Sequence, residues 1–159
     1  MPDQGSEIHG VLDGARRIWA VASINGARDR LVELHQRLGP ELRQGDRIVY
    51  LGNYLGAGAD PAGVIDEILD FRRYALTLPG AEPWDIVYLR GAREEMWQKL
   101  LQLQFAAAPR EVLEWMLGQG IEATLMAYGA NAEEGRTRAG EGVLSITRWT
   151  SALRGAMHR

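Results

Sequence analysis

The chain of 159 residues contains no cysteine. Disulfide bonds, thiol nucleophiles and thiolate metal ligands are therefore excluded, and the composition fits a reducing compartment. Histidine is scarce too, because only His9, His35 and His158 occur, and their spacing is not that of metal ligands. No apolar run reaches the ~20 residues that cross a membrane, and MPDQGSEIHG at the start lacks the basic and apolar regions of a signal peptide. We therefore expect a cytoplasmic protein without a membrane partner.

The chain also lacks an excess of positive charge. It has 18 Lys and Arg residues against 21 Asp and Glu residues, which gives a net charge of −3 at pH 7. General nucleic-acid binders are normally basic, so no nucleic-acid partner is expected. The residues that are present, 46% hydrophobic and 25% charged, are typical of a folded domain. At this length one domain is the default, and it can bury about 68–70% of its unfolded surface.

Short apolar runs alternate three times with helical periods in the first two thirds of the chain. The run IWAVASI favours a buried strand, whereas Leu31, His35 and Leu38 recur at helical spacing. Asp60 and Pro61 stand where an N-cap and a first helical residue are expected. This alternation predicts an α/β fold with a parallel β-sheet core of β-α units. The expected strands span residues 16–24, 46–52 and 84–91, and the expected helices span residues 28–38, 60–76 and 93–105.

The pattern changes after Phe105. PREVLEWMLGQG and IEATLMAYG favour two short helices, whereas the polar, glycine-rich segment 131–142 predicts a loop. A last amphipathic helix is expected from residue 143 to the end. We therefore divide the chain into a flexible leader, 1–14, and a single domain, 15–159, which is mostly helical from 105 to 159.

Each predicted strand runs into a turn that contains glycine. The three turns are ASINGA, LGNYLGAG and RGAREE, and the second holds Gly52, Gly56 and Gly58 within seven residues. The carboxyl ends of parallel strands lie at one edge of a sheet, where α/β proteins place their functional loops. The three turns should therefore lie side by side, although they offer few acids and bases.

Three ordered motifs resemble those of the calcineurin-like metallophosphoesterases. Members of that family carry GDxHG, GDxxDRG and GNHE, each after a strand, and this chain has ASING, GNYLGAG and GARE in the same order. The helix that follows, EEMWQKLL, is similar to that of the bacterial serine/threonine phosphatase and diadenosine tetraphosphatase branch. The resemblance covers residues 16–128. It implies the N-terminal half of the metallophosphoesterase fold, here followed by added C-terminal helices.

In that family the first two motifs supply ligands of a two-metal centre. The resemblance places Ser23 and Asn25 at the aspartate and histidine that hold the first metal, and Asn53 at the aspartate that bridges both metals. Gly56 stands at the aspartate that supports the catalytic histidine, and Ala57 at the arginine that grips phosphate. All five departures remove a charged or imidazole side chain.

The third motif departs in the same way. Ala92 stands at the asparagine that ligates the second metal and Arg93 at the histidine that protonates the leaving group, whereas Gly91 and Glu94 match. Two-metal hydrolysis needs charged or imidazole ligands and a bridging hydroxide. Losing even an outer-shell partner typically costs ~10–100-fold in affinity or activity, so four lost ligands should cost at least ~10⁴-fold. We therefore expect no metal and no other cofactor.

The emptied motifs predict a catalytically inactive protein, a pseudophosphatase that acts as an interaction or regulatory module. The alternatives are a residual phosphate- or nucleotide-binding protein and a weak, serine/threonine phosphatase-like phosphoesterase. An anion would be held by Arg93, Arg90, Asn53 and Asn25, together with loop amides. For the two arginines, a role as solvated charges at the start of a helix is the competing interpretation.

The three apolar runs also indicate whether the chain associates with a partner. IWAVASI, RIVYLGN and DIVYLRG are continuous rather than alternating, which is typical of strands buried on both faces. The predicted helices can cover only part of that surface. We therefore expect a partner, either a second copy in a homodimer or another protein chain, with an apolar interface above about 1,000 Å².

Overall fold

The computed structural model describes residues 12–157, so most of the proposed leader lies outside the described residues. The chain forms an α/β fold around a three-stranded parallel sheet with the order β1-β2-β3. Paired residues on neighbouring strands point to the same side of the sheet, and Trp19, Ile48 and Ile86 form one such row. The strands are β1 (Arg17–Val21), β2 (Asp46–Tyr50) and β3 (Ile86–Tyr88).

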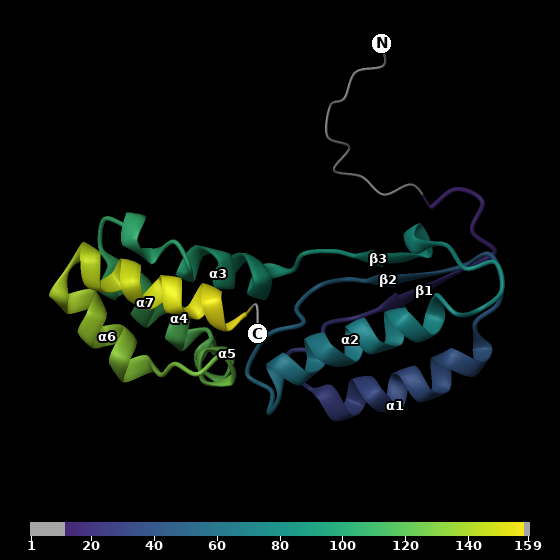
Figure 1. The fold of residues 1–159 in the computed structure, drawn as a ribbon, viewed down its shortest axis with the longest axis horizontal. Coiled ribbons are helices and arrows are strands. Elements are labelled where there is room, and N and C mark those ends of the chain that lie inside the picture. The colour runs from purple at the N-terminus through teal and green to yellow at the C-terminus, as the bar shows by residue number, and fades with distance from the viewer. Residues whose placement is uncertain (1–11, 158–159) are drawn as a thin grey trace, which may run out of the picture.

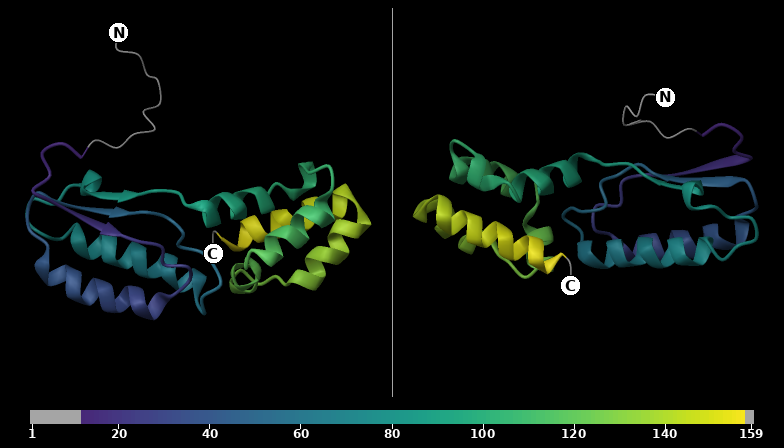
Figure 2. Two further views of the ribbon diagram at one scale, coloured as in Figure 1. Left: turned by 180° about the vertical axis from the view of Figure 1, so that it is seen from behind. Right: turned by 45° about the horizontal axis from the view of Figure 1, so that its top comes forward.

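Two helices, α1 (Arg28–Leu38) and α2 (Pro61–Ala75), lie on the same side of the sheet (Figures 1 and 2). Helix α1 has the bounds that the sequence predicts, and η1 (Gly39–Glu41) follows it as a turn of 3-10 helix. Helix α2 begins as predicted, because Asp60 Oδ1 accepts a hydrogen bond of 2.8 Å from Gly63 N. Together the strands and these helices bury one core, which includes Val21, Leu31, Leu38, Ile48, Tyr50, Val64, Ile68, Phe71 and Ile86.

The strands are shorter than the sequence predicts, and β3 is the shortest. The segment Pro83–Asp85 forms a turn of 3-10 helix, η2, instead of extending the strand. Glu82 N donates to Asp85 Oδ2 at 2.9 Å, and a proline has no N–H group for a sheet ladder. Leu89 N, one residue beyond β3, still donates to Tyr50 O at 2.8 Å, so hydrogen bonding to β2 continues past the end of the strand.

The rest of the chain forms a helical lobe, residues 92–157, beyond the carboxyl ends of the strands (Figure 1). We call residues 12–91 the sheet lobe. Among residues 12–157, none of the helices combines the length and the apolar character needed to cross a membrane. The helical lobe has its own core, with Leu100, Leu103, Leu113, Met116, Leu125, Ile146, Trp149 and Leu153. Its elements are α3 (Ala92–Leu100), η3 (Leu103–Phe105), α4 (Pro109–Gly118), α5 (Glu122–Ala127), α6 (Ala132–Glu141) and α7 (Val143–Ala156).

Helix α6 shows that the prediction of a polar loop at 131–142 is wrong. Asn131 caps the helix, since its Oδ1 accepts a hydrogen bond of 2.8 Å from Glu134 N. Gly135 is buried against the Trp149 ring, and ion pairs at helical spacing line the outer surface of the helix. These contacts offset the low helix propensity of glycine, which costs about 1 kcal/mol per residue relative to alanine.

The side of the sheet that faces away from α1 and α2 is not covered by any of the helices α1–α7 (Figure 2). Within the described residues, helices therefore cover one face of the sheet, whereas the sequence predicts that both faces are covered. Ile18, Leu51 and Leu89 on the uncovered side are 51%, 47% and 46% exposed. We define this open face by the alternate strand positions and their continuation, Ile18, Ala20, Val49, Leu51, Val87 and Leu89. Val49, on the central strand, is only 7% exposed because its neighbours on both adjacent strands flank it.

Candidate functional site

The loops that follow β1, β2 and β3 pack against one another at the carboxyl edge of the sheet. Gly52 has a φ of 89°, and a Cβ atom there would lie 2.4 Å from Gly91 N. A Cβ atom at Gly58 would lie 2.4 Å from the carbonyl carbon of Gly26. No side chain fits such backbone approaches, so contact between loops explains these glycines.

The carboxylate of Glu94, in the first turn of α3, holds two of the loops together. Its Oε1 accepts hydrogen bonds from Tyr54 N at 2.8 Å and Leu55 N at 3.1 Å. Its Oε2 accepts hydrogen bonds from Asn53 N at 2.7 Å and Gly91 N at 2.9 Å. We call this set of four hydrogen bonds the Glu94 clip. Hydrogen bonds to charged groups contribute ~1.5–3 kcal/mol each, so the clip is a strong local restraint.

Asn53, which the resemblance predicts to stand at a bridging aspartate, links all three loops. Its backbone has a φ of 55°, a left-handed conformation that asparagine tolerates. Its Nδ2 donates to Ser23 Oγ at 3.1 Å, and its Oδ1 accepts from Arg93 N at 3.1 Å. Its carbonyl oxygen accepts from Ile24 N at 3.1 Å and Asn25 N at 2.7 Å. Both ends of the side-chain amide are therefore engaged within the protein.

The other residues that the resemblance predicts to stand at ligand or catalytic positions make backbone contacts or face solvent. Asn25 has a φ of 52°, and its carbonyl oxygen accepts from Gly58 N at 2.8 Å. A Cβ atom at Gly56 would lie 3.0 Å from Asn25 Cα, so this position is closed to a larger side chain. Ala57 and Ala92 are exposed and carry no donor or acceptor in their side chains.

The two arginines proposed to hold an anion both have protein partners. Arg93 Nη1 donates to the carbonyl oxygen of Gln119, at the end of α4. Arg90 Nη1 donates to Glu95 Oε1 at 3.1 Å and to Gln98 Oε1 at 2.7 Å. Arg93 thus ties the start of α3 to the turn after α4. An anion at the loops would have to compete with these contacts.

Metal-ligating side chains are not gathered at the loops. Among residues 12–157, no three His, Asp or Glu side chains are grouped so that they could hold a metal ion. Two of the three histidines, His9 and His158, lie outside the described residues. Five cavities within residues 12–157 are lined by other parts of the chain, and none of these five includes Ser23, Asn25 or Asn53.

His35 lies in a buried polar network that the sequence analysis missed. Its Nδ1 lies 2.6 Å from Glu67 Oε1, its Nε2 lies 2.8 Å from the Tyr50 hydroxyl oxygen, and its ring stacks on Phe71 at a centroid distance of 3.8 Å. Burial lowers the pKa of His35, and a carboxylate can only accept, so the neutral ring donates from Nδ1 and accepts from Tyr50. The sequence does contain a clue to this network. His35 stands at a position where the helical period of α1 calls for an apolar residue, and a polar group that is buried needs hydrogen-bond partners.

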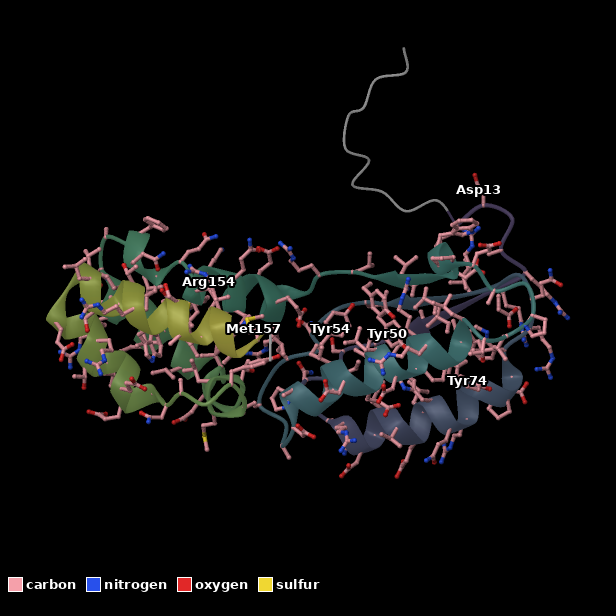
Figure 3. All side chains as sticks on the ribbon, viewed as in Figure 1. Asp13, Tyr50, Tyr54, Tyr74, Arg154 and Met157 are labelled. Carbon is pink, nitrogen blue, oxygen red and sulfur yellow. The ribbon has the colours of Figure 1, made fainter. Side chains whose placement is uncertain are left out.

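Tyr54, in the second loop, is another residue whose role the sequence did not reveal. Its hydroxyl donates to Leu89 O at 2.7 Å, and burial raises its pKa, so the hydroxyl stays protonated. Figure 3 places Tyr54 where the sheet lobe meets the helical lobe. The next residue, Leu55, packs into the core of the helical lobe. The second loop therefore joins the two lobes.

Comparisons with known proteins returned no relative. No family model matches the chain, and neither a curated protein nor a solved structure matches it.

Proposed function

We propose that the chain is a catalytically inactive, metallophosphoesterase-like protein, a pseudophosphatase that acts as an interaction or regulatory module. The observation that carries this proposal is the Glu94 clip. The one acid that matches the family's third motif accepts four backbone hydrogen bonds. The Asn53 amide joins Ser23 to the Arg93 backbone. Glu94 and Asn53 thus serve to hold the three loops together.

The chemistry of the loops supports this proposal. Ser23, Asn25 and Asn53 offer neutral oxygens where two-metal hydrolysis needs charged or imidazole ligands. Glu94 could ligate a cation only by releasing its amides, and a buried amide without an acceptor costs ~1–3 kcal/mol. The positive charge of Arg93 further disfavours a cation nearby. The finer fold assignment, the N-terminal half of a metallophosphoesterase, and a cytoplasmic location belong to the same proposal.

Hydrolysis assays test the proposal. With added Mn²⁺, release of product from p-nitrophenyl phosphate and from diadenosine tetraphosphate is expected to stay at background, because the charged metal ligands are missing. A matched set of variants identifies the source of any turnover. Turnover lost in Asn53→Ala or Arg93→Ala, but kept in Arg148→Ala on the exposed side of α7, would contradict the proposal.

Thermal unfolding of the same sample separates the phosphate- or nucleotide-binding alternative. A ligand that binds the loops and is present at 100 times its Kd should raise the midpoint by about 5 °C or more. We expect no such rise with phosphate or ATP, because the amides of Asn53, Tyr54, Leu55 and Gly58 and the side chains of both arginines already have hydrogen-bond partners. A rise that Arg93→Ala removes would select the alternative function.

A further inference from the structure

The free edge of β1 offers main-chain groups to a further strand. Within residues 12–157, β1 pairs with β2 alone, so its outer edge carries no strand. Val21 O accepts a hydrogen bond of 2.9 Å from Leu51 N, so Val21 and every second residue before it direct their main-chain groups towards β2. Ile18 and Ala20 therefore direct theirs to the free edge. An extended peptide can bond the N–H and the C=O of both residues, whereas a helix has its main-chain groups already paired.

The opposite edge of the sheet is less suited to such an addition. Strand β3 has only three residues, and it follows Pro83 in the turn η2. Short edge strands and prolines are features that protect a sheet edge from pairing with another chain. Strand β1 has five residues and no proline. The free edge of β1 is thus the longer and the less protected of the two.

A cavity of about 280 Å³ adjoins this edge on the side of α1. We call it the β1–α1 groove, and it lies between residues 19–21 of β1 and residues 34–41 of α1 and η1. Its walls are mainly apolar, because Trp19, Leu34 and Leu38 line it. The Trp19 ring is held in place, since its Nε1 donates to Asp46 Oδ2 at 3.2 Å. An apolar cavity of about 150 Å³ accepts benzene, so the groove can take an aromatic or leucine side chain.

The β1–α1 groove also carries a positive charge for which the chain supplies no counterion. Among residues 12–157, the Arg37 side chain, in the last turn of α1, has no hydrogen-bond or ion-pair partner. Glu41, the other charged residue of the groove, has a cation beside it, because Arg17 Nη2 donates to the Glu41 carbonyl oxygen at 2.6 Å. An acidic group of a ligand can therefore pair with Arg37. Side chains of a strand alternate between its two faces, so an apolar and an acidic residue enter the groove together when they are two positions apart.

The geometry points to a peptide ligand, and we propose that the β1–α1 groove binds an extended segment of a partner protein as a fourth strand of the sheet. The segment carries an aromatic or leucine residue and, two positions away, an aspartate or glutamate. Main-chain hydrogen bonds to Ile18 and Ala20 provide affinity, and the two side chains provide specificity. This inference rests on the proposed interaction function and names the chemistry of the partner.

Fluorescence anisotropy with a synthetic library of short labelled peptides tests the groove. Each peptide carries Phe or Leu and, two positions before or after it, Glu, with Val, Thr or Ser elsewhere. We expect members that bind, and Arg37→Glu should weaken the best of them by about tenfold or more, because it brings two like charges together. Replacing the glutamate of that peptide by lysine should restore binding to Arg37→Glu. Arg148→Glu is the matched control, since Arg148 is exposed on α7 and likewise has no partner among residues 12–157.

Hydrogen exchange of the wild-type protein gives a second readout, which does not depend on the folding of a variant. At saturation with the best peptide, the amides of Ile18 and Ala20 should exchange about tenfold more slowly or less, because they then donate to the added strand. A library in which no member binds with a Kd below about 1 mM would overturn the inference. Equal weakening by Arg37→Glu and Arg148→Glu would also overturn it, as would unchanged exchange at both amides.

The hydrolysis assays probe the three loops, whereas the peptide library probes the free edge of β1. Turnover in a protein that binds the peptides would contradict the inactive-protein proposal alone. Absence of binding in a protein without turnover would overturn the present inference alone.

Discussion

Glu94 illustrates how one side chain can satisfy two structural needs. At the third position of α3 it reaches back to Gly91 N, which is half of a capping box and ordinary at a helix start. The same carboxylate also accepts three amides of the loop after β2. A negative charge at a helix N-terminus is favourable in itself, so all four bonds reinforce one placement.

Removing this carboxylate should destabilise the protein. Glu94→Ala is expected to lower the free energy of unfolding by about 3 kcal/mol or more, because partly buried amides without an acceptor cost ~1–3 kcal/mol each. Urea denaturation measures the loss. Glu95→Ala is the matched control, since Glu95 is exposed, pairs with Arg90 alone, and should contribute less than about 1 kcal/mol. Similar losses in both variants would contradict a structural role for the clip.

At the level of the elements, α6 shows how position decides the effect of a glycine. Gly135 lies where a Cβ atom would be 2.8 Å from Trp149 Cη2 and 3.0 Å from Leu113 Cδ2. Gly140 lies in the same helix with no atom within 4 Å of such a Cβ. The first glycine permits close packing of α6 on α7, whereas the second only lowers helix propensity.

The same substitution at these two sites should therefore have opposite effects. Gly135→Ala is expected to lower the free energy of unfolding by about 1–2 kcal/mol, because the buried Trp149 ring cannot move aside without disturbing the core. Gly140→Ala should raise it by up to about 1 kcal/mol through helix propensity. Thermal and urea unfolding of both variants measure the difference. Stabilisation by both would show that the packing around Gly135 is loose.

Elements with a clear period could be predicted from the sequence, and elements held by distant contacts could not. The apolar spacing of α1 and the cap and proline of α2 identified both helices. At α6 the glycine-rich composition led to the wrong prediction of a loop. The contact of Gly135 with Trp149 joins two helices, so it cannot be recognised from the local sequence. For the three loops, the order of the motifs along the sequence identified where the glycine-containing turns lie. The clip itself joins residues about 40 positions apart, which a local pattern does not reveal.

At the scale of the whole molecule, the three loops form the junction between the sheet lobe and the helical lobe (Figure 2). Leu55 packs in the core of the helical lobe, and Ile65 on α2 contacts the cores of both lobes. Arg93 adds a hydrogen bond to the turn after α4. Under the proposed function, the positions that resemble those of a two-metal centre serve to connect the sheet lobe and the helical lobe.

Metal content tests this account most directly. The protein is incubated with excess Mn²⁺, Zn²⁺ or Fe²⁺, desalted, and measured by elemental analysis. We predict less than about 0.1 equivalent of metal per chain, because four lost ligands should cost at least ~10⁴-fold in affinity. Nearly two equivalents that are retained by the wild-type protein and released by Asn53→Ala would contradict the account.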